Sequence, residues 1–259
     1  MEKYRINGVS VTKYNPTTKI SETPIIMVHG GDHAGWCWEK WARFFCDTGY
    51  EVHAPDWYNH GDSDKLPEDE FIHRSIADVA KKEIAYVAEQ FEQAPIVIGH
   101  SMGGLAAALY AASSPVERLV LVAPVMPLSV HADPVPLPVD PTKAYPLFPY
   151  EQAKELFFTT LPDEEAQRYY QILGLESPQA VYEATRWTVD VDISKITAPT
   201  LILAAEFDRL IPNEPLKRYA ELLHADYHLI KGIGHSDILL KNPEWKTAAE
   251  VVKTWLDKS

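Results

Sequence analysis

The stretch "IVIGHSMGG", residues 96–104, places one serine between glycines where an apolar run gives way to an alanine-rich one. A nucleophile on a tight strand-to-helix turn needs backbone angles that crowd neighbouring side chains, so glycine suits the positions two before and two after it. Gly99 and Gly103 hold these positions around Ser101, where they let the chain turn and a substrate approach. A serine that only caps a helix is the alternative. The pattern therefore indicates a nucleophile only if other residues supply a base and an acid.

Two later residues could complete a catalytic triad with this serine. A serine hydroxyl is a weak nucleophile that requires a general base, itself oriented by a carboxylate. "LIKGIGHSD" places His235 just beyond an expected strand, and "LILAAEFDRLIP" places Asp208 beyond another. Either residue alone could be an ordinary loop or turn residue. The chain order Ser101, Asp208, His235, each after an expected strand, is typical of a nucleophile, an orienting acid and a general base.

Acyl transfer by a serine also needs backbone N–H groups that stabilise an oxyanion. The helix expected after Ser101 would aim its first N–H, that of Met102, at this charge. "VHGGDHAGW" offers Gly31 as a second donor without a side chain in the way, although an ordinary glycine turn is the alternative. A carboxylate beside such a site is unfavourable, so we expect Asp32 to point to solvent or to pair with a neighbouring histidine such as His33.

The elements that must position these residues alternate along the chain. Short apolar runs alternate with amphipathic stretches, which predicts one α/β domain, residues 1–259, with a mostly parallel twisted sheet covered by helices on both faces. The expected strands are residues 24–30, 51–56, 95–100, 118–124, 199–206 and 227–232, with a candidate antiparallel edge pair around residues 4–14. The expected helices are residues 38–47, 74–92, 102–113, 214–223 and 243–257.

Residues 127–192 break this alternation. The first part contains seven prolines, which neither donate to a ladder nor continue a helix: Pro127, Pro134, Pro136, Pro138, Pro141, Pro146 and Pro149. Three short helices are expected within residues 150–186. We interpret the segment as an inserted helical cap over the site, the alternative being a linker with helices packed on the sheet edge. Its aromatic residues could line an apolar pocket or pack the segment onto the sheet: Tyr145, Phe148, Phe157, Phe158, Tyr169, Tyr170, Tyr182 and Trp187, together with Trp36 and Trp38 beside the turn.

Composition narrows the classes of partner. With 37 acidic and 24 basic residues, the formal net charge of -13 disfavours binding to nucleic acid or to anionic membranes. No run of about 18 apolar residues is free of charge, and "MEKYRINGVSV" lacks an apolar targeting segment, so a cytoplasmic or already processed protein is expected. Cys37 and Cys46 are spaced too widely on a helix for a disulfide and make no metal motif.

These ordered motifs resemble the α/β-hydrolase fold family over nearly the whole chain. They are the "HGG" turn, "DWYNHGDSD", the "GHSMGG" elbow, the inserted cap, "AAEFDRLIP" and "GIGHSD". The resemblance implies Ser101, Asp208 and His235 as the triad, Gly31 and Met102 as the oxyanion donors, and no metal or organic cofactor. Haloalkane dehalogenases and epoxide hydrolases of this layout place an aspartate at the elbow, which Ser101 excludes.

Within the family, "HAGWCWEKW" looks like the branch of plant hydroxynitrile lyases and methyl-ester esterases. Those lyases carry a lysine immediately after the catalytic histidine, whereas this chain has Ser236 there. The sequence therefore predicts a serine hydrolase that cleaves a small, mainly apolar carboxylic ester or lactone. The alternatives are lyase or carbon–carbon cleavage by the same triad, or a non-catalytic small-molecule-binding protein on the same fold, against which the presence of all three triad residue types counts.

Overall fold

The computed structural model describes residues 1–135 and 137–258, so the predictions that fall on Pro136 and Ser259 lie outside the described residues. The described residues form one eight-stranded sheet in the order β1-β2-β4-β3-β5-β6-β7-β8. The strands are β1 (Glu2–Ile6), β2 (Val9–Tyr14), β3 (Ile25–Val28), β4 (Val52–Pro55), β5 (Ile96–His100), β6 (Arg118–Val122), β7 (Thr200–Ala205) and β8 (Asp226–Ile230). The six parallel strands and the antiparallel edge pair confirm the predicted fold class.

Strand β5 lies in the middle of the parallel part of the sheet. It pairs with β3 and β6, with Gly99 opposite Val28 and His100 opposite Val122. All five of its residues are buried, as expected for a strand covered on both faces. Because parallel strands end at the same edge, this register brings the loops after β3, β5 and β6 together.

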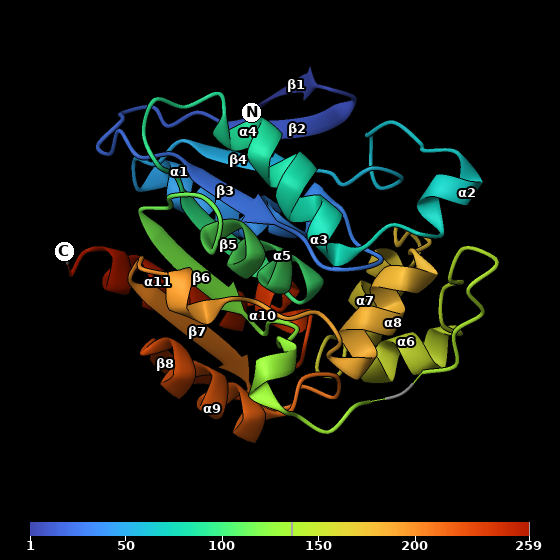
Figure 1. Cartoon of the computed structure of the whole chain (residues 1–259). Helices are drawn as coiled ribbons and strands as arrows, with labels where there is room; N and C mark the ends of the chain where they lie inside the picture. Colours follow the sequence, from blue (N-terminus) through green and yellow to red (C-terminus); the bar gives the residue numbers. More distant parts are fainter. Residues whose placement is uncertain (136, 259) are drawn as a thin grey trace.

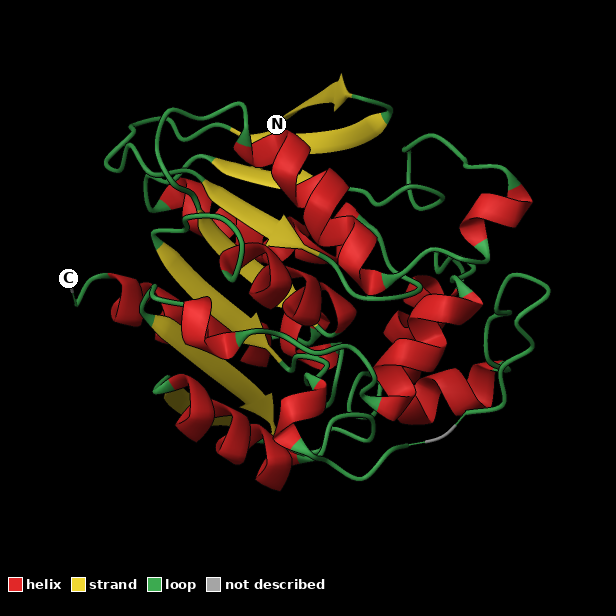
Figure 2. Cartoon of the chain, in the orientation of Figure 1, coloured by secondary structure: helices red, strands yellow, loops and turns green. Residues whose placement is uncertain are grey.

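Helices cover both faces of this sheet (Figures 1 and 2). Ile96 and Ile98 of β5 pack in one core cluster, whereas Val97 between them packs in the other, because successive side chains of a strand point to opposite faces. The first cluster includes residues of α1 (Glu39–Asp47), α10 (Asp237–Leu240) and α11 (Glu244–Leu256). The second includes residues of α3 (Ile76–Val79), the π-helical turn η2 (Ala80–Ile84), α4 (Ala85–Ala88), α5 (Met102–Ala111) and α9 (Asn213–Leu223).

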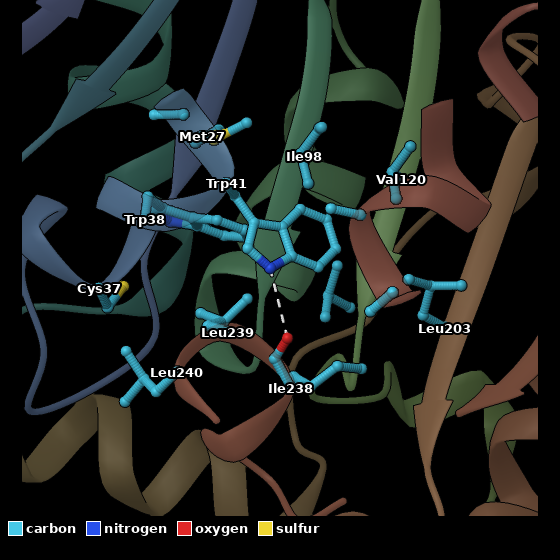
Figure 3. Close-up of a cluster of buried hydrophobic side chains, with 14 of the residues drawn as sticks. Met27, Cys37, Trp38, Trp41, Ile98, Val120, Leu203, Ile238, Leu239 and Leu240 are labelled. Atoms are coloured by element: carbon cyan, nitrogen blue, oxygen red, sulfur yellow. Dashed lines mark hydrogen bonds between the residues drawn. The ribbon is translucent and has the colours of Figure 1, made fainter. Parts of the chain in front are cut away.

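The core beneath the site also anchors the chain that follows His235. Figure 3 shows Trp41 of α1 among apolar side chains from β3, β5, β6 and β7. Its indole N–H donates to the carbonyl oxygen of Ile238, 3.3 Å away, at the start of the short helix α10. Cys37 is buried in this cluster, and Cys46 is partly buried at its edge; both are free thiols. The sequence pattern does not predict α10, although the first residue of this helix, Asp237, accepts the N–H of Gly234 next to His235.

The long connection between β6 and β7 contains the three short helices expected there. They are α6 (Tyr150–Leu156), α7 (Asp163–Tyr170) and α8 (Pro178–Arg186), with the 3-10 turns η3 (Leu128–Val130) and η4 (Ile193–Lys195). Figure 1 shows α6, α7 and α8 grouped beyond the arrowheads of the parallel strands. The interpretation of residues 127–192 as a cap stays a prediction. Two further short elements, the 3-10 turn η1 (Gly35–Trp38) and α2 (Glu68–Phe71), were not expected.

Candidate active site

The turn from β5 to α5 holds Ser101 in a backbone conformation that few residues adopt, with φ 54° and ψ -123°. A Cβ atom on Gly99 would lie 2.2 Å from the carbonyl oxygen of Gly103, and one on Gly103 would lie 2.2 Å from that of His29. Both glycines therefore make room for neighbouring backbone. Substrate approach was the other expected role of these glycines, but the atoms that a Cβ atom would meet belong to the protein.

The structure brings Ser101, His235 and Asp208 together in one chain of contacts. Nε2 of His235 lies 3.0 Å from Oγ of Ser101, and its Nδ1 lies 2.8 Å from Oδ2 of Asp208. Oδ1 of Asp208 accepts the backbone N–H groups of Leu210 and Ile211 at 2.8 and 2.9 Å. The side chains of His235 and Asp208 are buried. A carboxylate held in this way presents its second oxygen to the imidazole in a fixed direction.

His100, the residue before Ser101, holds the backbone of His235. Its Nε2 donates to the carbonyl oxygen of His235 at 3.1 Å, and the two rings lie 4.7 Å apart. Burial, together with repulsion from His235 and His33, lowers the pKa of His100 well below its ordinary value. His100 is therefore a neutral donor that links the elbow to the loop of the base. From the sequence alone, His100 is only the last residue of an expected strand.

Gly31 and Met102, the expected oxyanion donors, lie next to each other. A Cβ atom on Gly31 would be 2.8 Å from Sδ of Met102. Both residues line the same cavity as Ser101 and His235. Neither the Gly31 nor the Met102 backbone N–H donates to another residue in the described part of the chain. These two groups remain the candidate oxyanion donors.

Two neutral histidines fix the peptides on either side of Gly31. His29 accepts the backbone N–H of Trp57 at Nε2, 3.0 Å, so its proton is on Nδ1, which donates to the carbonyl oxygen of Gly30 at 2.8 Å. His33 donates from Nδ1 to the carbonyl oxygen of Gly31 at 2.7 Å. Burial lowers the pKa of His29 well below its ordinary value and that of His33 to about 4. The Gly30–Gly31 peptide is thus held with its N–H pointing away from the anchored carbonyl.

The expectation for Asp32 is wrong in both its forms. The residue is 7% exposed and does not point to solvent, and His33 donates to Gly31 instead of pairing with it. Within the described residues, Oδ1 of Asp32 has no hydrogen-bond partner. Burial first, and then repulsion from Glu176, raises the pKa of Asp32 to about 8. The side chain is therefore mostly uncharged at pH 7, so it places no full negative charge beside Gly31.

A cavity of about 60 Å³ opens over these groups and is mainly apolar. Residues of three kinds line it: the site residues Gly31, Asp32, His33, His100, Ser101, Met102 and His235; apolar residues near the strand ends, Val125, Leu210 and Ile211; and residues 135–187, namely Val135, Leu137, Tyr145, Phe148, Phe157, Val181, Ala184, Thr185 and Trp187. Half of the aromatic residues named for residues 127–192 thus reach the cavity.

The other aromatic residues pack elsewhere. Trp36 stacks on Tyr169 with ring centroids 5.6 Å apart, and Trp38 lies in the core against Trp41. Tyr182 is 44% exposed.

In residues 1–135 and 137–258, no group of three or more His, Cys, Asp or Glu side chains is arranged to hold a metal ion. No helix in the same ranges has the length and apolar character needed to span a bilayer.

The sequence profile described as the Alpha/beta hydrolase family matches residues 25–248. The chain belongs to this family. Among curated proteins, this alpha/beta hydrolase is similar to the non-heme chloroperoxidase of Burkholderia pyrrocinia, 27% identical over 215 residues that cover 73% of this chain and 76% of the relative. It is 33% identical to methylesterase 9 of Arabidopsis thaliana over 99 residues, which are 38% of this chain and 37% of that protein.

Solved structures place this alpha/beta hydrolase in the same fold. A thermophilic esterase from Thermogutta terrifontis superimposes with a TM-score of 0.70 at 17% identity, covering 100% of this chain and 99% of the esterase. At that identity the likeness establishes the fold alone. The matched curated relatives include proteins named as esterases and hydrolases, which supports a hydrolase.

Proposed function

We propose that this protein is a serine hydrolase that cleaves a small, mainly apolar carboxylic ester or lactone. The observation that carries the proposal is the position of His235, with one ring nitrogen 3.0 Å from the Ser101 hydroxyl and the other 2.8 Å from the Asp208 carboxylate. These are hydrogen-bond distances for a nucleophile, its base and an orienting acid.

The reaction follows from this geometry. Ser101 Oγ attacks the substrate carbonyl carbon while His235 takes the hydroxyl proton, and the oxyanion that forms is stabilised by the N–H groups of Gly31 and Met102. His235 then returns the proton to the leaving alkoxide, which departs as an alcohol and leaves an acyl-enzyme. In the second half, His235 takes a proton from water, whose oxygen attacks the acyl carbon; His235 then returns the proton to Oγ of Ser101 as the bond between Oγ and the acyl carbon breaks and the acid is released. Asp208 stabilises the imidazolium in both halves.

The cavity favours a short acyl or alcohol group. Its volume of about 60 Å³ is well below the roughly 300–1,000 Å³ of pockets for drug-sized ligands. Its walls are mainly apolar, so a small hydrocarbon group would be buried favourably. The name of one relative, methylesterase 9, agrees with a substrate that is an ester of a small alcohol.

The test is hydrolysis of p-nitrophenyl esters from acetate to octanoate by the wild type and Ser101→Ala. We expect turnover to be highest for the shortest esters and to fall at least about a thousandfold in Ser101→Ala. Ser113→Ala, at a serine just beyond the other end of α5, is the matched control and keeps wild-type turnover. Circular dichroism checks that all three proteins fold.

A folded Ser101→Ala protein with full esterase activity would contradict the proposal. If no ester is hydrolysed, product analysis with lactones, cyanohydrins and carbon–carbon substrates separates the other reactions of a triad from hydrolysis. Ligand binding without turnover of any of these would instead support a non-catalytic binding protein.

A further inference from the structure

The turn that carries Gly31 has an unusual backbone at the next residue. Asp32 has φ 61°, in the left-handed region that glycine favours and other residues enter at a cost in free energy. Such a conformation persists only where its surroundings hold it. The Gly31 N–H belongs to the preceding Gly30–Gly31 peptide, which His29 holds, so the contacts of the Gly31–Asp32 peptide fix Gly31 from its other side.

Residues that lie more than 140 positions away along the chain hold this turn. The carbonyl oxygen of Asp32 accepts the N–H of Gly174 at 2.7 Å. The N–H of Asp32 donates to Oε2 of Glu176 at 3.3 Å. Since His33 holds the carbonyl oxygen of Gly31, both ends of the Gly31–Asp32 peptide are engaged. Glu176 supplies the acceptor for its N–H end.

Glu176 is itself fixed and fully engaged. Its backbone pairs in both directions with Tyr145, and its Oε1 accepts the N–H of Ser177 at 2.7 Å. The residue is 2% exposed. A Cβ atom on Gly31 would lie 3.2 Å from Oε2 of Glu176, so the carboxylate packs directly against the turn. Neither the turn nor Glu176 can move without displacing the other.

His60 balances the charge of this carboxylate. Its Nε2 lies 3.2 Å from Oε2 of Glu176, and its Nδ1 donates to the carbonyl oxygen of Tyr58 at 3.0 Å. Both ring nitrogens thus face acceptors, which favours the imidazolium. Burial alone lowers the pKa of His60, but the Glu176 carboxylate raises it above its ordinary value. A protonated His60 and the Glu176 carboxylate form an ion pair beside the candidate oxyanion site.

We propose that Glu176 is a positioning residue for the reaction: it holds the Gly31–Asp32 peptide on one side of Gly31, while His29 holds the Gly30–Gly31 peptide on the other, and the two together keep the Gly31 N–H in place for the oxyanion, with His60 paired to the Glu176 carboxylate. The proposal rests on the proposed function. It assigns a role in catalysis to residues 174–176, which are not among the residues that line the cavity. The segment between β6 and β7 acts on the oxyanion donor through a side chain that does not touch substrate.

The test compares Glu176→Ala with Glu176→Gln and with a matched control, Glu183→Ala. Glu183 is also a buried carboxylate of the same segment, and it accepts the Ser75 hydroxyl and the Ile76 N–H, each at 2.9 Å, on the α3 side and away from the turn. Steady-state kinetics on p-nitrophenyl acetate at pH 7 give kcat and KM, and thermal unfolding gives Tm. A trifluoromethyl ketone, which forms an oxyanion when it adds to a serine, reports on the donors directly.

We expect Glu176→Ala to lower kcat about 10- to 100-fold with KM within about twofold, since loss of one oxyanion donor costs roughly 100- to 1,000-fold. Affinity for the trifluoromethyl ketone falls by a similar factor. Glu176→Gln restores most of kcat because its amide oxygen can accept the Asp32 N–H. Glu183→Ala lowers Tm but keeps kcat and ketone affinity.

An equal kcat in Glu176→Ala and Glu183→Ala, or a rise in KM at unchanged kcat, would overturn the proposal. If Glu176→Ala does not fold, Glu176→Asp decides, because a carboxylate shortened by one methylene keeps its charge but loses reach to the Asp32 N–H. A kcat for that variant equal to the wild type would also overturn it. Failure of the proposed function is distinct, because the wild type itself then shows no Ser101-dependent turnover.

Discussion

Asp208 and Asp32 are two aspartates with buried side chains near Ser101, and their surroundings differ. Asp208 receives two backbone N–H groups on one oxygen and the imidazole of His235 on the other. Asp32 has no partner for Oδ1 within the described residues and lies beside a second carboxylate, Glu176. One carboxyl group is thus surrounded by donors, and the other is not.

In the proposed reaction, the two aspartates would serve different ends. In that reaction, Asp208 orients His235 through the hydrogen bond to Nδ1. Burial and the neighbouring Glu176 raise the pKa of Asp32 to about 8, so this side chain is mostly neutral at pH 7, beside the group that must stabilise negative charge. Because both side chains are aspartates, the difference between them comes from their surroundings.

The largest expected effect comes from Asp208→Asn. With its amide oxygen held by the N–H groups of Leu210 and Ile211, the amide NH₂ faces Nδ1 of His235 and moves the ring proton to Nε2, which then cannot accept the Ser101 proton. We expect kcat on p-nitrophenyl acetate to fall about 1,000- to 10,000-fold with the fold intact. Asp32→Asn is the matched substitution, and we expect it to lower kcat far less at pH 7. Equal losses of kcat in the two variants would contradict the difference between Asp208 and Asp32.

A smaller effect is expected on the alkaline side for Asp32. As pH rises through about 8, the wild-type Asp32 loses its proton and places a negative charge beside Gly31, which opposes the oxyanion. We expect kcat/KM of the wild type to fall as pH passes this value, approaching tenfold per pH unit if only the protonated form is active. Asp32→Asn has no proton to lose and keeps a flat profile to higher pH. Profiles measured from pH 6 to 10 check this, and an unchanged alkaline fall in Asp32→Asn would show that another group causes it.

Much of the fold could be predicted because local signals agree with it. The alternation of apolar strands and amphipathic helices predicts the parallel sheet, and the glycines around Ser101 predict the strand-to-helix turn. Residues 74–92 were expected to form one helix, and the structure has α3, η2 and α4 in succession, with a π turn that helical periodicity does not reveal.

The contacts that hold the turn carrying Gly31 could not be predicted in the same way. Glu176 and Asp32 are 144 positions apart, so their contact depends on how the segment between β6 and β7 returns to the sheet. The sequence predicts that Asp32 points to solvent or pairs with a neighbouring histidine, because a carboxylate beside an oxyanion site is unfavourable; the structure instead buries the side chain and raises its pKa. The sequence offers one signal for His100, which is its position immediately before Ser101. In the structure, His100 at this position bonds to the backbone carbonyl of His235.

The central claim is that Ser101 is the nucleophile of this alpha/beta hydrolase. Its most direct test is reaction of the wild-type protein with a fluorophosphonate, followed by intact-mass measurement and peptide mapping beside a turnover assay. We predict one adduct per chain, on Ser101, with ester hydrolysis lost in proportion to labelling. An unlabelled Ser101, or hydrolysis that continues after Ser101 is fully labelled, would contradict the account.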